Sequence, residues 1–191
     1  YAETEDAFFR QDVVLTHPDY ELFADTLQYN VNTKVSYFFG PTNIISDENK
    51  IYTERGWYDT RTDEAFFHQN VLLENPPQTV AADTILYNRQ ARTGWAFSNM
   101  QLVDTARHFI VNANEAIYFE LENRIIAYEN PLMTNIIDRD SLHLAADTLV
   151  SIEDTVANIR TMYAYHDVRI FKSDLQGVCD SFVYSTADST L

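Results

Sequence analysis

Glycine is scarce in this sequence: the 191 residues include 4 glycines, well below the usual share of about 7%. The glycine-rich loops that cradle phosphate groups, or that bind calcium in β-solenoids, are therefore absent. Aromatic residues make up 14% of the chain, which is typical of a β protein, and β proteins usually turn on glycine. Other residue types must form the turns of this chain.

Cysteine, basic residues and long apolar runs are also scarce. The single cysteine, Cys179, permits no internal disulfide. Thirteen Lys and Arg residues stand against 29 Asp and Glu residues, and the net charge of −16 excludes nucleic acid as a partner, because phosphate contacts require clustered basic side chains. No apolar run is long enough to predict a membrane-spanning helix. The sequence begins at Tyr1 without a charged and apolar leader, so we expect a mature or excised piece from which a targeting signal has been removed.

The sequence repeats itself. A shift of 58 residues places 4–30 on 62–88 without a gap, and 13 of the 27 positions are identical. Half of that shift places Phe38 on Phe9 and Ile44 on Leu15. One polar position recurs every 29 to 33 residues, at Asp25, Glu54, Asp83, Asn114, Asp147 and Asp180. We therefore expect a single domain over residues 1–191, built from about six units of 29–33 residues and cut from a longer array.

Each unit has the pattern of two strands and two turns. An alternating segment such as 11–16 is followed by a polar or Pro turn, and then by a second segment with the motif Ala-Asp-Thr-Leu-x-Tyr or a variant of it. Period-two alternation and regularly spaced turn signals predict β-strands. Asn and Asp supply the turns because they tolerate left-handed backbone and hydrogen-bond to their own main chain. In one segment the spacing of Ile152, Val156 and Ile159 also fits a short helix capped by Ser151, so both interpretations stay open there.

The recurring carboxylates are the first candidates for chemistry, as calcium ligands or catalytic acids. Because one unit has Asn114 and glycine-rich loops are absent, we interpret them as residues that bond backbone or Thr groups beside a strand kink. The five histidines occupy different places in the repeat, with no second His or Cys at ligand spacing. Cys179 stands where other units have alanine, so we expect a small buried residue. The sequence therefore predicts no catalytic residue, no metal site, no cofactor and no enzyme activity.

Apolar residues at alternate positions form the most extensive pattern. On a strand, residues i and i+2 point to the same face, so these residues would form a continuous apolar stripe through successive units. The stripe is either the dry core of a solenoid or a groove that holds acyl chains, and the pattern alone leaves both open. Our candidate lipid-binding residues are Phe9, Val13, Leu15, Ile44, Val71, Leu73, Met100, Leu102, Val168 and Ile170.

A family resemblance rests on the segments FFRQDVVLTHPDYELFADTLQYN, FFHQNVLLENPPQTVAADTILYN and LHLAADTLVSI. They resemble the OstA-like domain of the lipopolysaccharide-transport proteins. These are the periplasmic bridge protein, its inner-membrane-anchored partner and the N-terminal domain of the outer-membrane translocon. The wealth of Tyr, Phe and Asn beside little Gly is similar to the version from Gram-negative bacteria of the Bacteroidetes type. The resemblance covers essentially the whole chain through a short repeat.

The resemblance implies an all-β fold: a repetitive, antiparallel, twisted β-jelly roll, V-shaped in section, open-ended and solenoid-like. It implies a non-enzymatic periplasmic domain that carries the lipid A acyl chains of lipopolysaccharide in an apolar groove toward the outer membrane. Copies of the chain or other OstA-like domains would join end to end by β-augmentation, as homo- or hetero-oligomers. The charge of −16 fits poorly with anionic head groups, for which only a few cations such as Arg89, Arg92 and Arg124 are candidate partners.

Two other functions stay open. The first is a structural or adhesive β-solenoid with a sealed core, which photocrosslinkers at Leu73 and Leu102 would distinguish from a lipid carrier. The second is a right-handed β-helix enzyme acting on polysaccharide. It would require acidic residues such as Asp83 and Asp147 to converge on one face of neighbouring coils.

Overall fold

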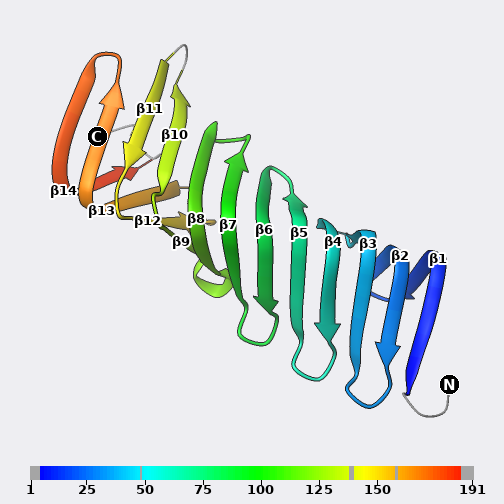
Figure 1. Cartoon of the computed structure of the whole chain (residues 1–191). Helices are drawn as coiled ribbons and strands as arrows, with labels where there is room; N and C mark the ends of the chain where they lie inside the picture. Colours follow the sequence, from blue (N-terminus) through cyan, green and yellow to red (C-terminus); the bar gives the residue numbers. More distant parts are fainter. Residues whose placement is uncertain (1–4, 48, 138–139, 158, 186–191) are drawn as a thin grey trace. The chain divides into compact units, whose positions relative to one another are not determined.

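The chain is an almost entirely β-stranded protein. The structure is a computed structural model that describes residues 5–47, 49–137, 140–157 and 159–185, and within these ranges there are fourteen strands, one short 3-10 helix and no α-helix (Figure 1). The predicted all-β class and the antiparallel pairing are confirmed. The two ends of the predicted domain, 1–4 and 186–191, lie outside the described residues. No described helix has the length and apolar character needed to span a membrane.

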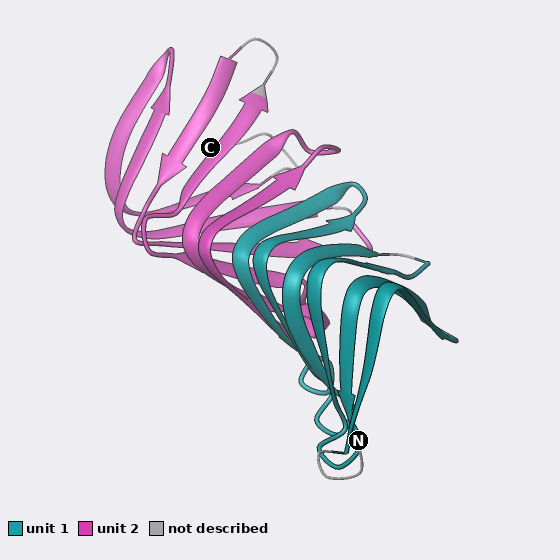
Figure 2. Ribbon diagram, turned by 45° about the vertical axis from the view of Figure 1, so that its right-hand side comes forward, with its two compact units in different colours: residues 1–92 teal, residues 93–191 magenta. Residues whose placement is uncertain are grey.

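The chain divides into two compact units, residues 1–92 and 93–191, which are shown separately coloured in Figure 2. Unit 1 is an antiparallel meander in which each strand pairs with the next one along the chain. Its strands are β1 (Asp6–His17), β2 (Tyr20–Asn30), β3 (Val35–Ile45), β4 (Lys50–Asp59), β5 (Glu64–Asn75) and β6 (Gln78–Asn88).

Asparagine makes turns of unit 1, as the shortage of glycine predicts. The side-chain oxygen of Asn30 accepts hydrogen bonds from the backbone N–H groups of Asn32 (3.0 Å) and Thr33 (2.8 Å). In the equivalent turn after β6, the side chain of Asn88 accepts a hydrogen bond from the backbone N–H of Ala91 (2.7 Å). These bonds hold the chain reversal without a glycine, because the side chain replaces a backbone acceptor.

Unit 2 contains the remaining elements: β7 (Thr93–Asp104), β8 (Phe109–Phe119), the 3-10 helix η1 (Glu120–Glu122), β9 (Arg124–Tyr128), β10 (Leu132–Ile137), β11 (Asp140–Ala145), β12 (Thr148–Asp154), β13 (Ile159–Lys172) and β14 (Leu175–Ser185). β8 pairs with β7 on one side and with both β9 and β10 on the other. β13 pairs with β11 and β12 on one side and with β14 on the other. Because Thr148–Asp154 is a strand, the strand interpretation of this segment is confirmed and the helical one is wrong.

The long strands of both units bend at a corner, which gives each unit a V-shaped section (Figure 2). In β1, β5, β7 and β13 the corner is two successive residues with left-handed backbone, and the pairing register shifts there; a further such pair connects β9 to β10. The corner pairs are Gln11 and Asp12, Gln69 and Asn70, Ser98 and Asn99, Glu129 and Asn130, and His166 and Asp167. In β3 the corner is Gly40 (φ 79°) followed by Pro41.

The corners divide each unit into two arms. In unit 1, arm A contains the segment of β1 before the corner, Asp6 to Arg10, with its paired neighbours, and arm B contains the segment after it, Val13 to His17. In unit 2, arm A contains β9, β12 and the adjoining halves of β7, β8, β13 and β14, whereas arm B contains β10, β11 and the other halves. Side chains from both arms line the interior of each V.

Candidate functional site

In arm B of unit 1, the interior is lined by a row of apolar side chains that takes one residue from each strand. Each member lies directly opposite the next in the pairing register: Leu15, Leu22, Ile44, Ile51, Leu73 and Val80. The row therefore brings together the predicted residues Leu15, Ile44 and Leu73. The predicted Val13 and Val71 lie one step nearer the corner, opposite Ala24 and Ala82.

Arm A of unit 1 contributes a second row, of which only Phe9 was predicted. Its members, again directly opposite one another, are Phe9, Leu27, Phe38, Gly56, Phe67 and Ile85. A sequence signal for this row exists. Phe9, Phe38 and Phe67 are spaced by 29 residues, and Leu27 and Ile85 each lie two residues after a recurring carboxylate.

Unit 2 has the same two rows with other side chains. The row of arm B contains the predicted Leu102 and Ile170: Leu102, Val111, Met133, Leu144, Ile170 and Gly177. The row of arm A is mostly small: Ala96, Ala116, Ala127, Leu149, Ala164 and Phe182. The predicted Met100 and Val168 lie opposite Ala113 and Cys179.

The candidate residues differ in how far solvent reaches them. Val71, Met100, Leu102 and Val168 are buried, whereas the other predicted residues of arm B are half-buried: Val13, Leu15, Ile44, Leu73 and Ile170. Phe9 is 50% exposed, because it lies on β1, which pairs with β2 alone among the described strands. The interior is thus packed in the middle of the rows and accessible at Phe9. The expectation that Cys179 is buried is wrong, because β14 has a strand partner on one side only within the described residues, and this leaves the thiol exposed.

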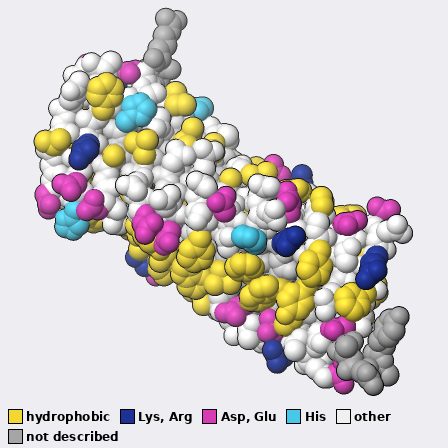
Figure 3. Space-filling model, in the orientation of Figure 1, with side chains coloured by type: hydrophobic (Ala, Val, Ile, Leu, Met, Phe, Trp, Pro, Cys, Tyr) yellow, Lys and Arg dark blue, Asp and Glu magenta, His cyan; other side chains and the backbone are white. Residues whose placement is uncertain are grey.

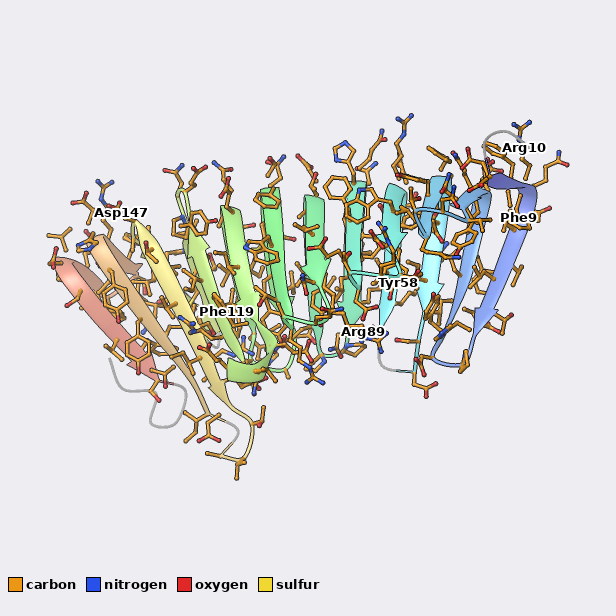
Figure 4. The ribbon with its side chains drawn as sticks, turned by 90° about the horizontal axis from the view of Figure 1, so that it is seen from below. Phe9, Arg10, Tyr58, Arg89, Phe119 and Asp147 are labelled. Carbon is orange, nitrogen blue, oxygen red and sulfur yellow. The ribbon has the colours of Figure 1, made fainter. Side chains whose placement is uncertain are left out.

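The recurring polar residues lie at the corners, one in each repeat unit. The side chain of Asn70 donates a hydrogen bond to the carboxylate of Glu54 (2.7 Å). The backbone N–H of Asn114 donates to the carbonyl of Glu129, and that of Asp147, labelled in Figure 4, donates to the carbonyl of His166 (both 3.0 Å). At Glu54 the carboxylate itself is the acceptor, whereas the bonds of Asn114 and Asp147 are made by the backbone. The interpretation that the recurring side chains bond backbone or Thr groups stays a prediction. Within the described ranges, no group of three or more His, Cys, Asp or Glu could hold a metal ion.

The candidate head-group cations contact groups of the chain itself. The guanidinium of Arg89 lies 4.0 Å from the carboxylate of Asp19. That of Arg124 lies 4.3 Å from the centre of the Phe119 ring and 2.7 Å from an oxygen of Glu122. Figure 4 labels both Arg89 and Phe119. The guanidinium groups of Arg89 and Arg124 thus each have a carboxylate of the chain as a neighbour.

A tyrosine of arm A, Tyr58, has a strongly perturbed ionisation. Burial raises the pKa of Tyr58 to about 12, and the hydrogen bond that its hydroxyl donates to Asp63 (2.8 Å) acts in the same direction. The hydroxyl of Tyr58 therefore stays neutral at physiological pH and acts as a hydrogen-bond donor. Tyr58 is labelled in Figure 4.

The outer face of unit 1 also carries aromatic side chains. A row in arm A that alternates with the interior row contains Phe8, Gln28, Tyr37, Trp57, Phe66 and Leu86. Phe8 is 51% exposed, and the rings of Trp57 and Phe66 are stacked with centroids 5.8 Å apart. Hydrophobic side chains gather on the face of unit 1 that Figure 3 shows.

The bent strands, the corner in each unit and the apolar rows define a class of protein: an antiparallel β-jelly roll built from repeats around an apolar interior. Residues 1–83 match the family model described as OstA-like protein. The resemblance to OstA-like proteins that the repeat predicts is thus confirmed in this part of the chain.

A solved structure has the same fold. It is LptH from Pseudomonas aeruginosa, described as the LptA-homologous periplasmic component of the conserved lipopolysaccharide transport device. The match has a TM-score of 0.52 and 11% sequence identity, and it covers 58% of this chain and 82% of that one. At this identity the likeness shows the fold alone. No curated protein sequence matches this chain.

Proposed function

We propose that this protein is a non-enzymatic component of a periplasmic lipopolysaccharide transport bridge, and that it holds lipid A acyl chains in its apolar interior. The observation that carries the proposal is the continuous row in arm B, which runs through all six strands of unit 1 and includes Leu15, Ile44 and Leu73. The OstA-like match of residues 1–83 and the fold shared with a periplasmic transport component support it.

An apolar row of this kind suits a ligand that must move. An acyl chain needs no specific polar partner, because its binding free energy comes from removing apolar area from water, at roughly 25 cal/mol per Å². Successive strands offer nearly equivalent apolar contacts, so a chain can pass from one to the next without crossing a deep minimum. The polar head group would stay outside the apolar interior, in water.

Assembly end to end would extend the rows beyond one copy. Within the described residues β1 pairs only with β2, and β14 only with β13, so each has an edge with backbone groups available to another strand. Another copy of this chain, or another OstA-like domain, is the partner that such edges fit. The single predicted domain over residues 1–191, as part of a longer array, belongs to this proposal.

One alternative is favoured by a specific observation. Met100, Leu102 and Val168 are almost fully buried within the protein itself, as expected of a structural β-solenoid with a sealed core. An enzyme acting on polysaccharide gains no such support, because the carboxylates Asp83 and Asp147 each lie singly at a separate corner.

A matched pair of neighbouring residues tests the proposal. Phe9 belongs to the interior row of arm A, and its neighbour Phe8 on the same strand belongs to the outer row. The two side chains are almost equally exposed, at 50% and 51%. A benzophenone photocrosslinker replaces either ring conservatively. We expect an adduct with lipopolysaccharide at Phe9 and little or none at Phe8. No adduct at Phe9, or equal adducts at both positions, would overturn the proposal in favour of a sealed core or nonspecific adsorption.

A further inference from the structure

A cluster of four charged side chains joins the two arms of unit 2. Asp104 and Arg107 lie at the tip of arm B, in the turn between β7 and β8, whereas Glu153 and Arg160 lie at the tip of arm A, where β12 pairs with β13. We call these four residues the clasp. Arg107 donates hydrogen bonds to Asp104 (3.1 Å) within its own arm and to Glu153 (2.6 Å) across the opening.

Arg160 makes the second connection between the arms. Its guanidinium pairs with Glu153 in its own arm and lies 3.8 Å from the carboxylate of Asp104 in the other. The same guanidinium lies 4.9 Å from the centre of the Phe109 ring, also in arm B. Arg160 and Asp104 are 3% and 1% exposed, so these contacts are shielded from solvent.

The position of the clasp gives it a mechanical role. The arms are joined at the corner, and the segment from Met100 to Asp104 extends about 16 Å from it at roughly 3.3 Å per residue. Contacts between the two tips therefore close the side of the V opposite the corner. A further hydrogen bond crosses the interior at the next strands, from the side-chain amide of Asn135 in β10 to the hydroxyl of Tyr184 in β14 (3.0 Å).

Unit 1 has a much weaker connection at the equivalent place. Asp19, at the tip of arm B, and Arg89, at the tip of arm A, lie 4.0 Å apart, and both side chains are about 60% exposed. An exposed ion pair of this length contributes little, because water screens it. The two units thus differ in how firmly their tips are held together.

A buried network of charges contributes less to holding two β arms together than its number of contacts suggests, because burying charged groups costs free energy. Desolvation offsets much of the attraction between the charges, and apolar side chains of similar size often hold such a contact better. Charged groups differ from apolar ones in that they are well solvated when the contact opens. The clasp therefore suits a contact that opens and closes more than one that is always closed.

We propose that the clasp is a releasable closure of the interior of unit 2, and that acyl chains enter this interior from the side when the clasp opens. The acyl-chain part rests on the function proposed above, whereas the closure of the arms does not. The buried residues Leu102 and Met133 of arm B would be the contacts that become available.

The test uses a double variant, Asp104→Asn with Arg107→Gln. It weakens both ionic contacts between the arms, leaves the Arg160–Glu153 pair intact and keeps the net charge of the chain unchanged. The asparagine retains the oxygen that accepts the Arg107 backbone N–H (2.9 Å), so the turn is preserved. The matched control is Lys172→Gln with Asp174→Asn, which removes an ion pair of the same unit that lies within one arm.

Two measurements separate the two parts of the proposal. Spin labels at the exposed tip residues Ala106 and Val156, in a Cys179→Ser background, report the distance between the arms. Lipid A with a diazirine in one acyl chain reports access, by mass-spectrometric comparison of peptides carrying Leu102 and Met133 with the peptide carrying Leu73. We expect longer and broader distances, and a severalfold increase in labelling of unit 2, in the clasp variant and not in the control.

The outcomes are distinguishable. Distances that are the same in the clasp variant and the control overturn the closure, whatever the lipid does. Longer distances with unchanged labelling of unit 2, while Leu73 is labelled, overturn the entry of acyl chains through the clasp. An absence of labelling in both units would instead overturn the proposed function. Circular dichroism confirms that each variant folds, and Arg107→Gln alone serves as a milder variant if the double one does not.

Discussion

The rings of Phe38 and Phe67 meet above Gly56, with their centroids 6.2 Å apart. Gly56 lies directly between them in the interior row of arm A, opposite Phe38 on one side and Phe67 on the other. A β-carbon at Gly56 would overlap both the Phe38 ring and the carbonyl oxygen of Phe66. One of the four glycines of the chain is therefore needed for packing rather than for a turn.

This packing predicts that Gly56→Ala destabilises unit 1. The backbone carbonyl cannot move away without disturbing the sheet, so we expect a loss of about 1–3 kcal/mol in the free energy of unfolding, or more. Urea unfolding followed by the fluorescence of the neighbouring Trp57 measures it. The control is Gly177→Ala, where a β-carbon meets no atom within 4 Å and stability should hardly change. A Gly56→Ala protein as stable as the control would contradict this account of the row.

Alternation predicted the strands and part of the arm B row, but of the arm A row it predicted Phe9 alone. In β1 the corner inserts two residues, so the alternation of inward and outward side chains continues across it, and Phe9 and Val13 both face inward. In β2 the corner is a single residue, Asp25, so the alternation of inward and outward side chains is shifted by one residue across it. Strict alternation from Ala24 therefore points to Thr26, whereas the inward residue is Leu27.

The clasp was invisible in the sequence for a different reason. Arg107 and Glu153 are 46 positions apart, and their contact does not recur from one sequence repeat to the next. Periodicity predicts contacts that every repeat makes, whereas this contact is made across the opening of unit 2 alone. The corner pairs were also missed, because residues such as Gln11 and Ser98 rarely adopt left-handed backbone.

The left-handed corners predict an unusual order of stability for substitutions at Gln69. This exposed residue has φ 73°, a conformation that costs an L-residue about 1–2 kcal/mol and is worst for a β-branched side chain. Gln69→Gly should therefore be at least as stable as the wild type, although glycine in a strand usually destabilises. Gln69→Val should be less stable than Gln69→Gly by about 1–2 kcal/mol. Thermal unfolding of the three proteins checks the order, and a more stable valine variant would contradict the corner geometry.

The raised pKa of Tyr58 predicts a loss of stability at high pH. Burial is its largest cause, followed by the hydrogen bond to Asp63. Because the folded-state pKa is about 12 and the ordinary value is 10, the stability that the neutral phenol provides is complete below pH 10 and is lost as the pH rises toward 12. The absorbance titration at 295 nm of the wild type minus that of Tyr58→Phe should have its midpoint near 12.

A second variant separates the two causes of this shift. Asp63→Asn removes the negative charge that accepts the hydrogen bond from the hydroxyl but leaves Tyr58 buried, so the midpoint should fall and still stay above the ordinary 10. A wild-type midpoint at 10 would show that solvent reaches the hydroxyl freely, which would contradict the packing of arm A at this position.

The proposed end-to-end assembly predicts a specific disulfide between copies. β14 occupies the place in its hairpin that β2 has in unit 1, so Cys179 corresponds to Ala24, which faces Val13 on one side and Thr42 on the other. A second copy that adds its β1 to the free edge of β14 would place its Val13 opposite Cys179, as Thr42 is opposite Ala24. Directly opposed residues have Cα atoms about 4.5–5.5 Å apart, and a disulfide spans about 4.4–6.8 Å.

We therefore expect Val13→Cys to form a ladder of covalent oligomers through the native Cys179 on mild oxidation, visible on a non-reducing gel and reversed by reductant. The neighbouring variant Val14→Cys is the control. The side chain at this position points to the other face of the same strand, and at 59% exposure it is open to oxidation from solvent. Adding Cys179→Ser should abolish the ladder of Val13→Cys. Equal ladders from both variants would indicate random collision, and no ladder from Val13→Cys would exclude strand addition in the repeat register.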